Sequence, residues 1–498
     1  MKNIIIIGGG IGGLFTGAIL AKEGYNITLF EKNVTIGGGL QTFNRNGYEF
    51  ETGMHIIGGL GKYGILKKIC TYLGIYDEIE YMNVDEDCMD TIHFASDNYT
   101  YKIAPGRDGF INSLSKEFPE ERENIKLYVD ALYEITDKIN LYNLKPSDSF
   151  IETYPESFLI PTNKFIENFT SNLKLREILA YMNPMYAGDA DHTPVYIHAL
   201  LNVLYINGPA RFIGGSQQLA DLLVNVIINN GGKILNNNPI IHIEIGDKEI
   251  QYVEDKNGIK YTADKYISAI HPTSLLNIVD DKAFPRSYRN RLNSIPNSYS
   301  AFTIYIVLKE NSFPYINHTC YYQDDYGKIW DYGKDDNEWP HGFMYMTPPI
   351  KNQGKYAEKL IITSPMNFNA VKKWENTKVG KRGEEYENWK KECTEKALLK
   401  IETLYPDIRE KIKLLYTSSP LTIRDYYNVK EGSMYGYKKD CENIMLSKIP
   451  VNTKVKNLLL TGQNINLHGI CGVPLTAINT AEAILGLNTI INKLSNQQ

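Results

Sequence analysis

The amino-terminal segment changes its hydrophobic period twice, as is typical of a βαβ unit. Residues 4–7 are four consecutive isoleucines and suit a strand that is buried on both faces. Residues 12–22 carry apolar side chains at helical spacing and stop before Gly24, and residues 26–30 again favour a strand. The pattern therefore predicts a strand, a helix and a second, parallel strand.

Similar patterns return far along the chain. Residues 42–50 have Asn46-Gly47 at their centre, and this pattern predicts a β-hairpin with a type I′ turn. An apolar stripe predicts a helix over residues 217–230, where Gly231 ends it. Residues 234–245 and 265–270 are expected to add strands to the first sheet, followed near the carboxyl end by a buried strand at 458–460 and a helix at 477–484.

This order predicts an α/β fold in which a Rossmann-like nucleotide domain is discontinuous and an α+β substrate domain is inserted into it twice. The nucleotide domain is expected at residues 1–76, 206–271 and 429–498. The inserted domain is expected at residues 77–205 and 272–428. A chain of 498 residues is too long for one hydrophobic core, which agrees with two domains.

Composition narrows the range of partners. The net charge of −5 and the scattered lysines provide no electrostatic attraction to nucleic acid. The six cysteines include no Cys-x-x-Cys pair, which argues against structural zinc, iron–sulfur clusters and a disulfide framework. We expect no metal, a cytoplasmic location and at most peripheral contact with a membrane, because no later segment approaches the length of a transmembrane helix.

The glycines between the first strand and the helix are the strongest functional signal. The spacing Gly8-x-Gly10-x-x-Gly13 lets the backbone turn tightly, approach a pyrophosphate and pack the helix closely on the strand. Glu31 ends the second strand, where a carboxylate accepts hydrogen bonds from ribose hydroxyls and rejects a 2′-phosphate. A signal peptide or membrane span over residues 4–21 is excluded by its six glycines and by the lack of a cleavage site. We interpret the unit as a dinucleotide site.

A second glycine triplet, Gly59-x-Gly61-x-x-Gly64, repeats the spacing of the first. Only Ile56-Ile57 precede it as an apolar stretch, and no acid stands about twenty residues beyond it. We interpret this triplet as a flexible loop that leads into a helix over residues 65–73 and binds no nucleotide.

Six motifs in one order identify a resemblance that spans nearly the whole chain. They are Gly8-x-Gly10-x-x-Gly13 with Glu31, Gly37-Gly38 before Gln41-Thr42-Phe43, Glu51-Thr52-Gly53-Met54-His55-Ile56-Ile57-Gly58, Gly214-Gly215-Ser216, Pro420-Leu421-Thr422 with Gly432-Ser433-Met434-Tyr435-Gly436, and Leu460-Thr461-Gly462 with Gly469 and Gly472. In these residues the chain resembles FAD-dependent oxidoreductases of the phytoene desaturase, carotenoid isomerase and retinol saturase group. It looks most similar to the retinol saturase branch.

The resemblance implies FAD as the cofactor, held at positions along the whole chain. The adenosine half and pyrophosphate would lie against Gly8, Gly10, Gly12, Gly13, Glu31, Lys32, Gly38 and Gly39, the adenine against the backbone of Ile240 or Ile241, and the ribityl and isoalloxazine along Gly462, Gly472 and Val473. Two positions depart from the family pattern. Gly39 stands where the family often has arginine, which removes a cation near the phosphates, and Ile213 stands where it often has proline.

Three side chains near the expected flavin are candidate catalytic residues. Saturation of a double bond needs a proton as well as a hydride, and histidine and tyrosine are the natural donors near neutral pH. His55 is the first candidate, followed by His468 and Tyr435; the alternative for each is a structural side chain that lines or packs the cavity. His198 is expected to be a buried, satisfied histidine, and Cys471 to be a small packing residue.

The leading hypothesis for function is a flavin enzyme that saturates, desaturates or isomerises a carbon–carbon bond of an apolar conjugated substrate, such as a retinoid or carotenoid. One alternative is a flavin amine oxidase, which shares the amino-terminal fingerprint. Another is a non-catalytic binder of lipidated proteins, of the GDP dissociation inhibitor type. No separate nicotinamide fingerprint is present, so the electron donor or acceptor stays open.

Overall fold

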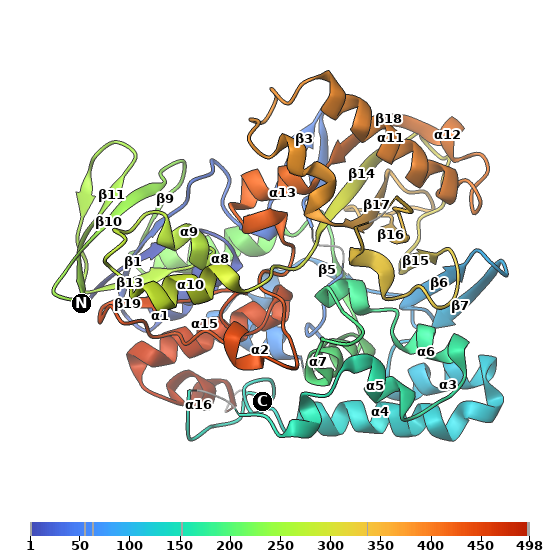
Figure 1. The fold of residues 1–498 in the computed structure, drawn as a ribbon, viewed down its shortest axis with the longest axis horizontal. Coiled ribbons are helices and arrows are strands. Elements are labelled where there is room, and N and C mark those ends of the chain that lie inside the picture. Colours follow the sequence, from blue (N-terminus) through green and yellow to red (C-terminus); the bar gives the residue numbers. More distant parts are fainter. Residues whose placement is uncertain (1, 54–55, 62–63, 151–152, 336, 496–498) are drawn as a thin grey trace.

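The computed structural model describes residues 2–53, 56–61, 64–150, 153–335 and 337–495, and two sheets organise them (Figure 1). The first sheet has five parallel strands in the order β19-β13-β1-β2-β9. Its strands are β1 (Asn3–Ile7), β2 (Asn26–Phe30), β9 (Lys233–Leu235), β13 (Lys265–Ser268) and β19 (Leu458–Leu460). Three distant parts of the chain therefore share one sheet, and the expected Rossmann-like α/β fold class is confirmed.

Alternate residues of β1 belong to different cores. Ile4 and Ile6 pack with helices on one face of the sheet, whereas Ile5 and Ile7 pack under a small antiparallel sheet on the other. The covering elements are the helices α1 (Ile11–Lys22), α8 (Gln217–Asn229) and α15 (Gly469–Leu485) and the strands β10 (Ile240–Gly246), β11 (Glu249–Asp255) and β12 (Lys260–Tyr261). The isoleucine run is thus buried on both faces, as its pattern predicted.

Two expected elements have different bounds in the structure. A single strand over residues 234–245 is wrong, because β9 ends at Leu235 and β10 begins at Ile240 in the antiparallel sheet. The turn between them has Asn237 at φ +49°, and the Asn238 amide donates to the Glu31 carbonyl at 2.8 Å. The helix expected over 477–484 begins at Gly469, so Gly472 and Val473, which were expected along the flavin, lie at its start.

The second sheet has seven strands in the order β18-β14-β17-β16-β15-β6-β7. They are β6 (Asp90–Phe94), β7 (Tyr99–Ile103), β14 (Ser300–Leu308), β15 (Thr319–Gln323), β16 (Gly342–Met346), β17 (Lys359–Met366) and β18 (Ile412–Ser418). Helix α11 (Glu384–Ile401) packs on one face. The predicted hairpin, β3 (Thr42–Arg45) and β4 (Tyr48–Glu51), packs on the other face through Phe43 and Phe50, with Asn46 and Gly47 both at positive φ as a type I′ turn requires.

The remaining helices connect or flank the two sheets, with α4 and α7 packed side by side below the second sheet in Figure 1. They are α2 (Ile65–Leu73), α3 (Arg107–Glu117), α4 (Arg122–Asp137), α5 (Thr162–Glu167), α6 (Leu173–Leu179), α7 (Val195–Ile206), α9 (Pro272–Leu276), α10 (Arg286–Ser294), α12 (Ile408–Lys411), α13 (Pro420–Tyr427), α14 (Ile444–Ser447) and α16 (Thr489–Ser495). A short antiparallel pair, β5 (Tyr81–Asn83) and β8 (Ala210–Phe212), lies between the sheets.

Candidate functional site

A groove of about 260 Å³ runs along the carboxyl ends of the parallel strands. Many of the residues expected to hold the cofactor line it: Gly8, Gly10, Gly12, Glu31, Lys32, Gly38, Gly39, Gly462 and Val473. Gly13 and Gly472 are buried away from its lining. Ile240 lines the groove, whereas the Ile241 side chain is 50% exposed and does not.

The tight turn at the centre of the groove needs glycine at several positions, because a side chain there would overlap other atoms of the protein. Gly8 has φ +108°, and a Cβ on Gly13 would stand 2.0 Å from the Gly8 carbonyl oxygen. A Cβ on Gly12 would stand 2.8 Å from the Gly462 Cα. Gly10 differs, because its Cβ would meet nothing closer than the Gly38 Cα at 3.9 Å. The space beside Gly10 belongs to the groove, where a pyrophosphate at the amino end of α1 would take it.

Glu31 stands beside this turn with its carboxylate oriented by the backbone. The Gly9 amide donates to Oε2 and the Asn33 amide donates to Oε1, each at 2.8 Å, and the side chain is buried. A carboxylate offers about four lone-pair positions, so two stay available for ribose hydroxyls. The remaining acceptor positions of Glu31 therefore fit the adenosine half of a dinucleotide that lacks a 2′-phosphate.

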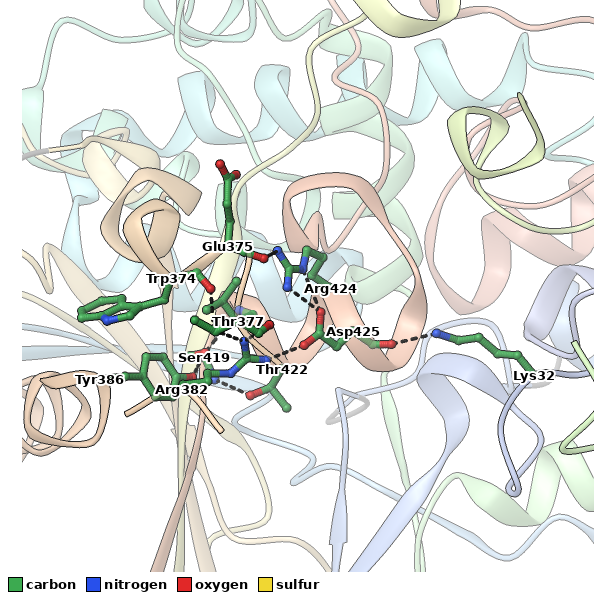
Figure 2. A network of polar contacts seen from close by, with 11 residues as sticks. Lys32, Trp374, Glu375, Thr377, Arg382, Tyr386, Ser419, Thr422, Arg424 and Asp425 are labelled. Carbon is green, nitrogen blue, oxygen red and sulfur yellow. Dashed lines mark hydrogen bonds and ion pairs between the residues drawn. The ribbon is translucent and has the colours of Figure 1, made fainter. Parts of the chain in front are cut away.

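Lys32 lies on the groove, and its ammonium group also reaches α13. The Nζ atom donates to the Asp425 carbonyl of α13 at 2.7 Å (Figure 2). Burial lowers the pKa of Lys32, while Glu31 and Asp425 oppose that change. Lys32 thus contacts α13 and keeps further N–H groups for the groove, so its expected role at the cofactor stays a prediction.

Helix α13 forms that wall and is held by a charged network, shown in Figure 2. The Asp425 carboxylate pairs with Arg382 and, at 2.8 Å, with Arg424. The Arg382 side chain is almost fully buried, so this ion pair is largely removed from water. Tyr427, at the end of the helix, faces both the groove and a neighbouring cavity. Sequence reasoning missed this network, although the Pro420-Leu421-Thr422 motif marked the helix.

The neighbouring cavity is apolar and has a volume of about 200 Å³. Its walls include Tyr305 of β14, Met344 of β16 and Ile361 of β17, so the second sheet forms one side. The cavity and the groove share Ile11, Gly39, Tyr427, Met434, Gln463 and Val473. These shared residues make the apolar cavity a continuation of the groove.

Glu51 is the only carboxylate among the described residues that line this cavity. Burial raises its pKa to about 7, and hydrogen bonds from Ser216 oppose that rise. The Ser216 amide donates to Oε1 at 2.7 Å and the Ser216 hydroxyl donates to Oε2 at 2.5 Å. Sequence reasoning did not select Glu51, because its partner lies 165 positions away.

The structure brings two of the three catalytic candidates together. Tyr435 lines the apolar cavity, and its ring centroid lies 5.1 Å from that of His468. Burial raises the pKa of Tyr435, whereas burial and then Lys439 lower the pKa of His468 to about 4. His468 lines a separate polar cavity. His55 lies outside the described residues.

Two other residues that the sequence analysis selected, His198 and Cys471, have surroundings that suit a structural role. His198 is fully buried and hydrogen-bonded to Tyr128 at 2.6 Å and to Tyr186 at 2.9 Å, as expected of a satisfied histidine. The Cys471 thiol donates to the Gly58 carbonyl at 3.0 Å, and burial raises its pKa to about 12, which makes it an inert packing residue. Within the described part of the chain, no cluster of side chains is arranged to hold a metal ion, and no helix is long and apolar enough to cross a bilayer.

The site resembles those of known proteins in sequence and in fold. A family model described as an NAD(P)-binding Rossmann-like domain matches residues 6–73. The all-trans-retinol 13,14-reductase of Danio rerio is 23% identical over 534 residues, which cover 99% of this chain and 87% of that protein. Prolycopene isomerase 1, chloroplastic, of an Oncidium hybrid cultivar is 24% identical over 473 residues, which cover 87% and 75%.

A solved structure of a putrescine oxidase triple mutant shares the fold, with a TM-score of 0.66 at 14% identity over 97% of this chain and 98% of that one. The fold is therefore common to proteins with different reactions, and it does not choose among them. The relatives found by sequence are more specific than the fold, because their names match the group that the six motifs indicated. That resemblance is confirmed.

Proposed function

We propose that this chain, which resembles the phytoene desaturase, carotenoid isomerase and retinol saturase group, is an FAD-dependent oxidoreductase acting on a carbon–carbon bond of an apolar conjugated substrate. The observation that carries the proposal is the junction of the glycine-lined groove with the apolar cavity at Gly39, Met434 and Val473. A dinucleotide suits the first space, and a polyene suits the second. The relatives named as a retinol reductase and a prolycopene isomerase support this substrate class.

The groove residues would hold the adenosine half of FAD, and the junction residues would hold its redox end. Glu31 would accept hydrogen bonds from the ribose, and the space beside Gly10 would admit the pyrophosphate. Gly38 and Gly39 would lie along the pyrophosphate, and Gly462 and Val473 would lie along the ring system. When bound, FAD supplies or accepts the hydride.

The side chains of the apolar cavity would then exclude water from the reacting bond and supply the proton. The apolar walls exclude water from the reacting bond, which protects a hydride transfer from side reactions. Saturation also consumes one proton for each hydride. Tyr435 is the hydroxyl candidate that reaches this cavity, while His468 faces the polar side and His55 follows the same hairpin as Glu51.

The test starts with the colour of the purified full-length protein, because bound FAD absorbs visible light and is released on denaturation. The flavin is then reduced without oxygen and mixed separately with a retinoid, a carotenoid, a conjugated dienoic lipid and a primary amine. We expect a polyene to reoxidise the flavin and to gain two hydrogens, measured by mass spectrometry. A desaturase would instead transfer hydride from a more saturated polyene to the oxidised flavin. A protein that neither carries nor takes up FAD would refute the proposal.

A flavin amine oxidase is the second candidate, and one observation favours it. Aromatic side chains including Tyr321, Tyr332 and Phe343 line the cavity together with the Glu51 carboxylate, so an ammonium group would find partners there. This reading predicts that an amine reduces the oxidised flavin and that hydrogen peroxide forms in air. A colourless protein that binds a prenylated peptide would indicate the non-catalytic alternative.

We also propose that the apolar substrate reaches the chain from a membrane by peripheral contact, since polyenes partition into lipid. Cosedimentation of the purified protein with liposomes tests this contact, and recovery of all the protein in the supernatant would refute it. The two-electron donor or acceptor that recycles the flavin is left open between a nicotinamide and another redox protein.

A further inference from the structure

A second cavity, of about 210 Å³, lies on the far side of Tyr435 from the apolar one. Its lining includes the polar side chains of Lys439, His468, Asp189 and His192, and we call it the polar cavity. Tyr435 lines both cavities and is therefore the partition between them. A space of this size with several polar groups on its wall has room for water molecules.

The partition is fixed in place by its neighbours. The Tyr435 amide donates to the Ser298 hydroxyl at 3.0 Å, and the Ser298 amide donates to the Gly436 carbonyl at 2.8 Å. The His468 ring lies against the Tyr435 ring and is hydrogen-bonded to the Met185 backbone. With its pKa lowered to about 4, His468 is neutral at neutral pH and supports Tyr435 without storing a proton.

Lys439 is an amine that lines the polar cavity and acts electrostatically on His468, the neighbour of Tyr435. Its Nζ donates to the Ser447 carbonyl at 3.0 Å, which leaves further N–H groups for the cavity. Burial and the nearby Lys448 lower the pKa of Lys439 to about 7. The adjacent charged residues on its own segment are Lys438 and Asp440, which also line the cavity.

The outer end of the polar cavity reaches solvent. Asp189 and His192 form an ion pair at 3.0 Å, and their side chains are 38% and 50% exposed. The hydrogen bond from Asp189 raises the pKa of His192. Groups that exchange protons with bulk water therefore stand at one end of the cavity and Tyr435 stands at the other.

We propose that Lys439 is the proton source for the apolar cavity and acts through Tyr435. This inference rests on the proposed function and adds the route of its proton. In the saturating direction, the Tyr435 O–H bond breaks as a C–H bond forms at the substrate. A proton from the Lys439 ammonium, carried by water in the polar cavity, passes to the tyrosine oxygen in the same step. The hydride, which carries both electrons, comes from reduced flavin. A two-electron donor such as a reduced nicotinamide then reduces the flavin again. Lys439 regains its proton from solvent past Asp189 and His192.

The first test measures the Lys439 amine without any turnover. The full-length protein is labelled with a small amount of acetic anhydride between pH 5 and 10, and each acetylated lysine is quantified by mass spectrometry. We expect half-maximal labelling of Lys439 near pH 7, and Lys438, which is partly exposed and stands 3.9 Å from Asp189, is the internal comparison. Lys448→Met should move the Lys439 midpoint upward, because it removes a repelling charge. An ordinary lysine midpoint for Lys439 would overturn the inference.

The second test follows the oxidation of reduced flavin by a reactive polyene as a function of pH. For the wild type, the rate should fall as pH rises through about 7, because Lys439 loses its proton there. Lys439→Met should be slower by at least about ten-fold and should lack this step. Lys439→Arg keeps the positive charge but holds its proton too tightly to transfer it, so it should be equally slow. Lys438→Met should keep the wild-type profile.

The outcomes separate the two proposals. Rescue by Lys439→Arg would show that only the charge matters, and a wild-type profile in Lys439→Met would show no role; either overturns the inference and leaves the function standing. Failure of every polyene to react with the wild type would remove the proposed function and the inference together. Equal flavin content and equal denaturation midpoints in all variants exclude misfolding as the cause of a slow rate.

Discussion

Two glycine triplets with the same spacing lie in this chain, and their first and last glycines are placed alike. In Gly8-x-Gly10-x-x-Gly13 and in Gly59-x-Gly61-x-x-Gly64, the first glycine has positive φ, +108° and +75°. In both, a Cβ on the last glycine would stand 2.0 Å from the carbonyl oxygen of the first. The shared spacing therefore encodes a tight turn, and the turn by itself does not encode a ligand.

The surroundings of the two turns explain why only the first one lines the groove. Gly8 ends the central strand of a parallel sheet and opens onto the groove, with Glu31 at the end of the next strand. Gly59 follows an isolated pairing of Ile57 with Ala210, and its Cβ would meet the Cys471 Sγ at 3.1 Å. None of the second triplet's glycines lines the groove. A Cβ on Gly59 would also meet Leu204 of α7, whereas Gly61 is exposed and its Cβ would meet nothing, so the interpretation of this segment as a flexible loop stays a prediction.

The largest expected effect is that of Gly13→Ala. The new methyl group would overlap the Gly8 carbonyl, so the backbone must shift, at a cost of about 2–3 kcal/mol in the free energy of unfolding. The same shift displaces the amide groups that face the pyrophosphate, and FAD affinity should fall by at least about 100-fold. Urea denaturation of the apoprotein and titration with FAD measure the two losses. Normal values for both would show that the turn tolerates a side chain.

Gly64→Ala should separate stability from binding. Its Cβ would stand 2.0 Å from the Gly59 carbonyl oxygen, so the free energy of unfolding should fall by a similar amount, about 2–3 kcal/mol. The flavin content of each folded molecule should stay unchanged, because this turn does not reach the groove. Gel filtration before the flavin measurement isolates the folded fraction. A loss of flavin from that fraction would mean that the second triplet contributes to the site.

Glu31→Ala should act mainly on the cofactor. The substitution removes the acceptor of the buried Gly9 and Asn33 amides and of the ribose, so FAD affinity should fall by about 10- to 100-fold. Apoprotein stability should fall by about 1–3 kcal/mol, because two amides lose their partner. Glu78→Ala is the matched control, since this exposed acid follows the second triplet and should change neither quantity. Full occupancy by FAD in Glu31→Ala would place the ribose elsewhere.

The smallest and most specific effect is expected from the middle glycines. Gly10→Ala has room in the protein alone, so apoprotein stability should change by less than about 0.5 kcal/mol. Its methyl group would occupy the space of the pyrophosphate, and FAD affinity should fall by about ten-fold. Gly61→Ala meets nothing within 4 Å and should alter neither stability nor affinity. Equal FAD affinity in both variants would break the distinction between the two triplets.

The sequence by itself determined the features that depend on neighbouring residues. The isoleucine strand, the glycine turn, helix α1 and the Asn46-Gly47 hairpin were all predicted, and the structure confirms them. Each depends on backbone sterics or on a hydrophobic period within about a dozen residues, so a local pattern contains the information that decides it. The fold class and the family followed from the order of such patterns.

Only the tertiary structure decided which distant groups meet. Lys32 donates to Asp425, 393 positions away, and the expected single strand after Gly232 divides between two sheets. The apolar and polar cavities on either side of Tyr435 likewise combine segments that no local pattern connects. The physical reason is that partner choice and desolvation depend on the packing of the whole chain. A lysine or carboxylate acquires its partner and its altered pKa only after folding has enclosed it.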